Sequence, residues 1–181
     1  MSASIWVQRF ASLVPSGAAV LDVACGGGRH LRFFRDRGHP VVGIDRDLSG
    51  VADLSPIDGV QLIDADLENG SPFPLANRRF GGVVVTNYLH RPLLPAISAA
   101  VAPGGVLLYE TFAIGHEWYG RPDNPDFLLR DGELLELASA SGLRVVAYEA
   151  MLVERATGIG PVVDDGDLVV SKVQRLAAVA Y

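Results

Sequence analysis

The 181-residue chain lacks the features that mark secreted, membrane-spanning and nucleic-acid-binding proteins. Its only cysteine, Cys25, excludes an intramolecular disulfide and is compatible with the reducing cytoplasm. No apolar run is long enough to span a membrane, and no basic stretch followed by an apolar core marks a signal peptide. The formal net charge is −6, whereas a nucleic-acid partner normally requires a basic face. We therefore expect a cytoplasmic protein that contacts neither membrane nor nucleic acid.

The sequence also lacks internal repeats and the spacing of metal ligands, which bears on the number of domains and on the kind of site. Internal repeats and low-complexity tracts are missing, and the length is that of one domain spanning residues 1–181. Hydrophobic residues make up 49% of the chain, which is enough to bury a core. No cluster of His, Cys or carboxylate residues has the spacing of metal ligands, so we expect no metal site.

A strand, a glycine-rich turn and the start of a helix follow one another in residues 20–30. Residues 18–23 form the apolar run of a parallel strand covered on both faces, interrupted only by Asp22. Residues 26–28 are all glycine, which removes side chains where the backbone turns sharply and approaches a ligand. The helix expected over residues 29–38 directs its first N–H groups at that ligand, which favours a carboxylate or phosphate.

A second acid identifies the ligand as a nucleoside. Asp45 ends the next apolar strand, where a carboxylate beside a glycine turn accepts hydrogen bonds from a ribose diol. The dinucleotide fingerprint requires a third small residue after Gly26 and Gly28, but Leu31 occupies that place. The pattern therefore disfavours NAD.

The run Asp22-Val-Ala-Cys-Gly-Gly-Gly28 resembles motif I of class I S-adenosylmethionine-dependent methyltransferases, with Ala24 where that motif has its first glycine. The turn 103–105 and two long apolar runs, 143–153 and 168–180, extend the resemblance. The chain looks most like the small bacterial members of the tellurite-resistance and thiol methyltransferase type. The resemblance implies a Rossmann-like, doubly wound seven-stranded sheet, mostly parallel, with an antiparallel C-terminal strand.

The resemblance also implies S-adenosyl-L-methionine as cofactor and S-adenosyl-L-homocysteine as product. Asp66 then accepts from the exocyclic amine of adenine and the Leu67 N–H donates to a ring nitrogen. The alternative is that these two residues belong to a solvated acidic loop. The cofactor-binding residues expected are Asp22, Ala24, Cys25, Gly26, Gly28, His30, Asp45, Arg46, Asp66, Leu67, Thr86 and Asn87.

The segment after the fourth strand, residues 86–91, is expected where the methyl group is transferred, because ligands meet the carboxyl ends of strands in open α/β sheets. We expect Tyr88 to place its hydroxyl near the sulfonium. His90 has two interpretations: it acts as a general base, or it caps the helix that follows.

A long irregular loop at residues 113–129 is a candidate substrate lid, since such loops in compact domains are usually functional. In this interpretation His116, Tyr119 and Arg121 contribute to catalysis and select the acceptor. In the alternative, Trp118 and Phe127 fill the core beneath the last helix. The N-terminal segment 1–16, with a helix over residues 4–14, also has two interpretations: it packs on the edge of the sheet as a lid, or Trp6 or Arg9 helps to cover the mouth of the cofactor site.

These observations predict a methyltransferase that acts on a small molecule, because a chain this short has little surface to grip a macromolecule. Thiols, chalcogen oxyanions, phenols and amines are the acceptors considered. Two alternatives are an RNA methyltransferase that works with a partner and a non-catalytic S-adenosylmethionine-binding subunit. The assembly expected is a monomer or homodimer.

Overall fold

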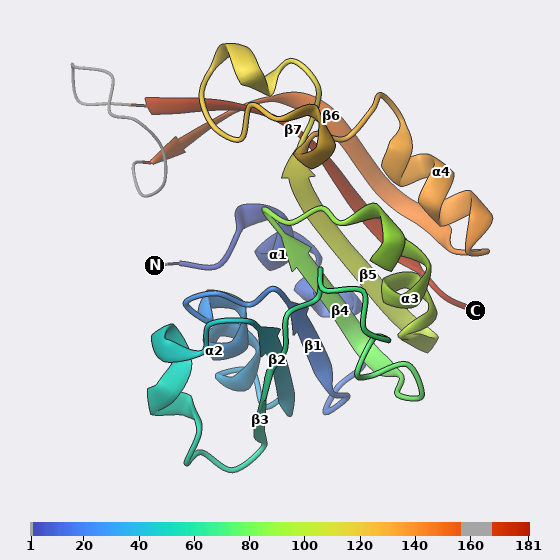
Figure 1. Cartoon of the computed structure of the whole chain (residues 1–181). Coiled ribbons are helices and arrows are strands. Elements are labelled where there is room, and N and C mark those ends of the chain that lie inside the picture. The colour runs from blue at the N-terminus through green and yellow to red at the C-terminus, as the bar shows by residue number, and fades with distance from the viewer. Residues whose placement is uncertain (1, 157–167) are drawn as a thin grey trace.

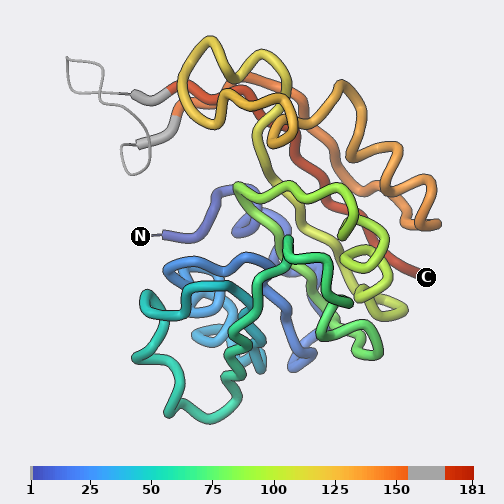
Figure 2. Tube along the Cα trace, viewed as in Figure 1, coloured from blue at the N-terminus to red at the C-terminus, as the bar shows by residue number. Residues whose placement is uncertain are grey.

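A seven-stranded sheet forms the centre of the computed structural model, which describes residues 2–156 and 168–181 (Figures 1 and 2). The strand order is β3-β2-β1-β4-β5-β7-β6. The first five strands are parallel, and β7 runs antiparallel to both β5 and β6. The predicted fold class is therefore confirmed. The strands are β1 (Val20–Val23), β2 (Val41–Asp45), β3 (Val60–Asp64), β4 (Phe80–Thr86), β5 (Val101–Phe112), β6 (Arg144–Ala156) and β7 (Leu168–Val179).

Helices cover both faces of this sheet (Figure 1). Alternate residues of the central strands point to opposite faces, so Val83 and Val85 join one hydrophobic cluster and Val84 joins the other. One cluster includes residues of α1 (Ile5–Phe10), α2 (Arg29–Arg35) and the 3₁₀ helix η2 (Ser49–Leu54). The other includes residues of α3 (Leu94–Ala99) and α4 (Glu133–Ala140).

The N-terminal helix packs on the sheet, as the first of its two interpretations required. Trp6 is 1% exposed, and its indole N–H donates to the Leu176 carbonyl at 3.1 Å. Arg9 lies outside it and pairs with Glu149 at 3.1 Å. Both side chains are thus committed to holding α1 against β6 and β7, and the expectation that they cover the cofactor is wrong. Two short 3₁₀ helices, η1 (Ala11–Leu13) and η3 (Arg91–Leu93), follow α1 and precede α3.

Several predicted boundaries move by a few residues. β5 starts at Val101 rather than at residue 106, because the turn residues 103–105 continue the strand and the Gly104 N–H donates to the Ala180 carbonyl. Two further 3₁₀ helices, η4 (His116–Trp118) and η5 (Pro125–Phe127), divide the loop 113–129. The loop predicted between the last two strands falls at residues 157–167, outside the described residues.

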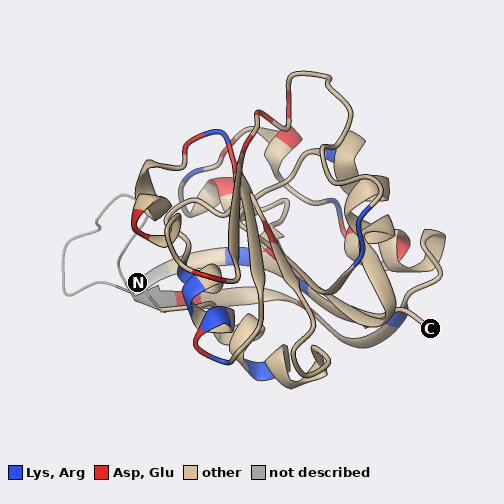
Figure 3. Ribbon diagram, turned by 90° about the horizontal axis from the view of Figure 1, so that it is seen from below, with Lys and Arg blue, Asp and Glu red and all other residues tan. Residues whose placement is uncertain are grey.

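Charged residues are spread over the described part of the chain, and its helices are short. Lys and Arg lie on several elements, with Asp and Glu interspersed among them (Figure 3). Across residues 2–156 and 168–181, every helix is too short or too polar to cross a bilayer.

Candidate nucleoside site

The turn between β1 and α2 is built from left-handed residues. Ala24, Gly26 and Gly28 have φ angles of 54°, 50° and 68°. These three residues reverse the chain direction within a few positions, and a side chain on Gly28 would collide with Val51 of η2. The glycine at position 28 is therefore required twice, for its backbone conformation and for the close approach of η2.

Asp45 holds this turn from the neighbouring strand end. Its carboxylate accepts from the Gly26 N–H at 2.8 Å and from the Asp47 N–H at 3.0 Å, one bond to each oxygen. Because β1 and β2 are parallel and adjacent, their carboxyl ends bring the acid and the turn together. Each oxygen keeps a lone pair that can accept from a ligand.

A pocket of about 230 Å³ opens beside Asp45. Three strand ends supply it, those of β1, β2 and β3, together with the segment after β4. In addition to Asp45, its lining includes four of the residues predicted to bind cofactor, Ala24, Arg46, Asp66 and Leu67. The remaining lining residues are Ala65, Glu68 and Tyr88.

Tyr88 was expected near the transferred methyl group but lies in this pocket, beside Asp66–Glu68. His90 is half-buried and precedes η3, but its side chain makes no capping hydrogen bond there. The capping interpretation of His90 is thus wrong, whereas its role as a base stays a prediction.

Asp22 and His30 lie beneath the glycine turn rather than in the pocket. Asp22 is 1% exposed, and its Oδ2 atom has no hydrogen-bond partner among the described residues. His30 is 2% exposed; its Nε2 accepts from the Ser4 N–H at 3.2 Å, which leaves the proton on Nδ1, 3.7 Å from that oxygen. Burial raises the pKa of Asp22 above its ordinary value, against the lowering effect of His30. The prediction that the His30 side chain contacts cofactor is therefore corrected.

Cys25 also turns its side chain inward. The thiol is buried against Gly43 of β2, and burial raises its pKa to about 12. The thiol is therefore protonated at neutral pH, and Cys25 is outside the lining of the pocket.

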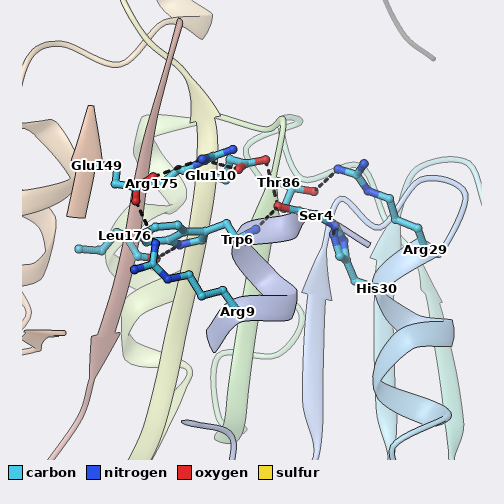
Figure 4. A network of polar contacts seen from close by, with 10 residues as sticks. All are labelled: Ser4, Trp6, Arg9, Arg29, His30, Thr86, Glu110, Glu149, Arg175 and Leu176. Atoms are coloured by element: carbon cyan, nitrogen blue, oxygen red, sulfur yellow. Dashed lines mark hydrogen bonds and ion pairs between the residues drawn. The ribbon is translucent and has the colours of Figure 1, made fainter. Parts of the chain in front are cut away.

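Sequence reasoning missed Arg29, the first residue of α2. Its guanidinium donates to the Thr86 hydroxyl at 3.3 Å, which joins the glycine turn to the end of β4 (Figure 4). A cation in the first turn of a helix opposes the helix dipole, so its presence was a signal of a functional or positioning role. Asn87, the next residue after Thr86, has a φ of 55° and bends the chain toward the pocket.

The sequence also did not reveal a buried ion pair next to Thr86. Glu110 at the end of β5 accepts from Arg175 at 2.6 Å and from the Ser4 hydroxyl at 3.2 Å (Figure 4). Arg175 also reaches Glu149 of β6 at 3.2 Å. The Glu110 carboxylate is therefore paired with a cation from β7 inside the protein.

His116 does not act as the sequence suggested. It is 2% exposed and stacks on Phe112, with 4.3 Å between ring centroids. Its Nδ1 accepts from the Lys172 N–H at 3.3 Å, and its Nε2 then donates to the Arg121 carbonyl at 3.0 Å. Both ring nitrogens are therefore hydrogen-bonded to backbone groups, and neither is available as a base.

The other aromatic residues of this loop face outward. Trp118 is 83% exposed and Phe127 is 44% exposed, so the expectation that they fill the core is wrong. Tyr119 and Arg121 are exposed as well. Arg91 joins the loop to the segment after β4, because its guanidinium donates to the Asp126 and Leu128 carbonyls, each at 2.8 Å. Among the described residues, no three His, Cys, Asp or Glu side chains come together as a metal ion would require.

The fold is an α/β sheet of the Rossmann-like type, and the pocket lies at the carboxyl ends of its parallel strands. The sequence profile of a methyltransferase domain matches residues 3–150, most of the chain. The chain belongs to this methyltransferase family. Among curated proteins, none matches the chain.

Solved structures of distant sequence share the fold. TehB from Haemophilus influenzae matches with a TM-score of 0.72 at 18% identity over 97% of this chain; this chain covers 61% of TehB, less than two thirds of its length. The Haloferax volcanii complex between the Trm112 methyltransferase activator and a methyltransferase matches with a TM-score of 0.69 at 19% identity. The match covers 97% of this chain and 89% of that one. The Burkholderia thailandensis 1,6-didemethyltoxoflavin-N1-methyltransferase, with 1,6-didemethyltoxoflavin and S-adenosylhomocysteine bound, matches with a TM-score of 0.64 at 20% identity. The match covers 96% of this chain and 75% of that one.

Proposed function

We propose that the protein transfers a methyl group from S-adenosyl-L-methionine to a small-molecule acceptor and releases S-adenosyl-L-homocysteine. The observation that carries the proposal is the pocket in which Asp45 and Asp66–Leu67 converge beside the glycine turn. Family membership supports methyl transfer, and the similarity to an enzyme crystallised with S-adenosylhomocysteine supports the cofactor. The similarity to the Burkholderia thailandensis enzyme, crystallised with 1,6-didemethyltoxoflavin, supports a small-molecule acceptor.

The residues of the pocket suit this cofactor. Asp45 has a spare lone pair on each oxygen for the ribose hydroxyls. Asp66 would accept from the adenine amine, while the Leu67 N–H would donate to a ring nitrogen. Arg29 uses one N–H for Thr86 and has others that can bind the carboxylate of the methionine part.

When bound, the cofactor supplies an electrophilic methyl group on a positively charged sulfur. The acceptor atom forms its bond to this methyl as the carbon–sulfur bond breaks, and the sulfur keeps the electron pair as a neutral thioether. The chain contributes alignment and exclusion of water at the ends of β4 and β5. A thiol acceptor needs little help, since it ionises near neutral pH, whereas a phenol or amine would give its proton to His90.

Two other functions are candidates, and the experiments described below distinguish them from methyl transfer to a small molecule. A second candidate is methylation of RNA with a partner that supplies basic surface; the similarity to a chain in complex with the Trm112 activator supports the partner alone. A non-catalytic cofactor-binding subunit is the third. We expect the chain alone to be a monomer or homodimer.

Calorimetry with S-adenosylmethionine, S-adenosylhomocysteine and NAD tests the cofactor. We expect both sulfur nucleosides to bind and NAD not to bind. Asp45→Ala should weaken binding by about 1–3 kcal/mol, because it leaves hydrogen-bonding groups unpaired. Asp58, an exposed carboxylate outside the pocket lining, provides the control Asp58→Ala, which should bind as the parent does. Binding of NAD, or an unchanged Asp45→Ala, would contradict the proposal.

Release of S-adenosylhomocysteine tests the acceptor class. Thiols, chalcogen oxyanions, phenols and amines are offered in turn, followed by RNA with and without a cell fraction that supplies a partner. Turnover with a small molecule supports the proposal. Turnover only with RNA selects the second candidate, and binding without any turnover selects the third.

A further inference from the structure

Tyr88 is held firmly in an unusual place. The left-handed Asn87 before it turns the chain, and the Asn87 N–H donates to the Glu110 carbonyl at 2.9 Å. The hydroxyl of Tyr109, a residue that is fully buried in β5, donates to the Tyr88 carbonyl at 2.9 Å. The backbone of Tyr88 is therefore fixed from two sides, so its ring is directed by the fold.

The hydroxyl of Tyr88 is buried and makes no well-formed hydrogen bond among the described residues, although the Glu68 carboxylate lies near it. Tyr88 belongs to the lining of the nucleoside pocket together with Asp66, Leu67 and Glu68. A buried hydroxyl without a partner is unfavourable, and such groups are rare in folded proteins unless a ligand satisfies them.

The surroundings decide which part of a ligand this hydroxyl meets. Burial raises the pKa of Tyr88; the Glu68 carboxylate raises it further through its charge and as an acceptor for the phenol, followed by the charges of Asp66 and Asp45. The phenol therefore stays protonated at neutral pH and acts as a hydrogen-bond donor. The strongest influence comes from Glu68, next to the residues proposed to read the adenine edge, and Asp45 on the ribose side contributes least.

We propose that Tyr88 is a specificity residue that donates a hydrogen bond to a ring nitrogen of the purine base. The inference rests on the proposed cofactor and moves Tyr88 from the methyl-transfer centre to the base. A purine presents its ring nitrogens as acceptors, so a protonated phenol in the same pocket is complementary to it. A base with a donor at that place would leave two donors facing each other and would be rejected.

Calorimetry of S-adenosylhomocysteine binding to Tyr88→Phe tests the inference. The variant removes only the oxygen, and we expect affinity to fall about tenfold, the effect of one lost hydrogen bond. Tyr148 of β6 is outside the pocket lining, so Tyr148→Phe is the matched control and should bind normally. The melting temperature of ligand-free Tyr88→Phe should hardly change, since the hydroxyl makes no well-formed hydrogen bond in the ligand-free protein.

Analogues of S-adenosylhomocysteine that lack one ring nitrogen each, the 1-deaza, 3-deaza and 7-deaza forms, identify the acceptor atom. For one analogue, Tyr88→Phe should cause no additional loss of affinity, whereas the other two should still show the tenfold difference. Three outcomes overturn the inference: unchanged binding by Tyr88→Phe, an equal loss with all three analogues, or a lower melting temperature without ligand. If the parent protein fails to bind S-adenosylhomocysteine, the proposed function fails instead.

Discussion

The carboxylate of Asp45 accepts a 2.8 Å hydrogen bond from the backbone N–H of Gly26, so the acid that is proposed to bind ribose also holds the glycine turn. The same carboxylate accepts from the Asp47 N–H at 3.0 Å. The end of β2 therefore shapes the turn after β1 before any ligand arrives. Affinity measured on Asp45 variants will combine lost ligand contacts with a less ordered turn.

Asp45→Ala should lower the free energy of unfolding even without ligand. Two backbone N–H groups lose their acceptor, and we expect a decrease of about 1 kcal/mol because both groups are partly accessible to water. Urea unfolding measures this change, with Asp58→Ala as the control. An unchanged midpoint for Asp45→Ala would mean that water replaces the carboxylate completely.

Ala24→Gly should stabilise the protein. Ala24 has a φ of 54°, a left-handed conformation that disfavours an alanine by about 1–2 kcal/mol, whereas glycine adopts it freely. Glycine loses more entropy on folding, so the expected net gain is about 0.5–1 kcal/mol. Thermal unfolding should show a rise of a few degrees. Ala52 in η2 provides the opposite case, and Ala52→Gly should lower the melting temperature; a decrease for both variants would contradict the argument.

The central part of the fold and one side of the site were predictable because they depend on local pattern. The apolar run before the glycines, the turn itself and Asp45 are contiguous or nearly so. Asp66 followed from resemblance. Each of these residues is close in sequence to the strand end that places it, so the parallel sheet brings them together without further information.

The other residues depend on contacts that sequence does not show. Arg175 meets Glu110 only because of the register between β5 and β7. Tyr88 enters the pocket because Asn87 adopts a left-handed conformation, which a single asparagine does not reveal. His116 looked catalytic in a polar, aromatic loop, but a histidine that holds backbone from within a loop has the same local sequence. Composition cannot distinguish a buried loop residue from an exposed one.

Asp22 should make the unfolding free energy depend on pH in the direction opposite to most carboxylates. Burial raises its pKa in the folded state above the unfolded value of about 3.8, so the folded protein holds the proton more tightly. The stability contributed by this proton is complete below the unfolded pKa and is lost as pH rises through the folded one. The neutral isostere Asp22→Asn should remove this loss.

Urea unfolding at about pH 4, 6 and 8 measures the effect as the difference between the parent and Asp22→Asn. We expect the free energy of unfolding of Asp22→Asn to increase relative to that of the parent as pH rises. The increase should be about 1.4 kcal/mol for each unit by which the pKa of Asp22 is raised in the folded state. Asp58→Asn, at an exposed carboxylate, is measured alongside as the control. A constant difference for Asp22→Asn would show that the pKa of Asp22 is not raised.

Arg91→Met should destabilise the protein strongly. Arg91 forms a two-pronged ion pair with Glu133, at 2.7 and 2.9 Å, and holds two carbonyls of the loop before α4. Removing it leaves a 4% exposed Glu133 with much weaker compensation, so we expect a loss of about 2–3 kcal/mol. Arg130 also contacts Glu133, at 3.6 Å, but is largely exposed. Arg130→Met should therefore lose less than about 1 kcal/mol, and equal losses would contradict a clamp formed by Arg91.

The loop 113–129 separates into a fixed base and an exposed tip, and the two should respond differently to mutation. His116→Ala removes the ring that joins Lys172 and Arg121, so we expect the unfolding free energy to fall by about 1–3 kcal/mol. Tyr119→Phe and Arg121→Ala alter exposed side chains, so stability should be unchanged. If the tip closes over the acceptor, both should lower kcat/KM with the acceptor found in the turnover screen, while the Kd of the cofactor is unchanged.

Thermal unfolding, cofactor calorimetry and steady-state kinetics on the same three variants decide whether the exposed tip of the loop acts as a lid or has no role in the reaction. A misplaced contact can reduce the rate by about two orders of magnitude, so a decrease below about threefold for both Tyr119→Phe and Arg121→Ala would count against the lid. His116→Ala serves as the structural reference, because its activity should fall only in proportion to the folded protein lost. A stable His116→Ala with greatly reduced kcat/KM would restore this histidine to the reaction and would require that one ring nitrogen leave its backbone partner.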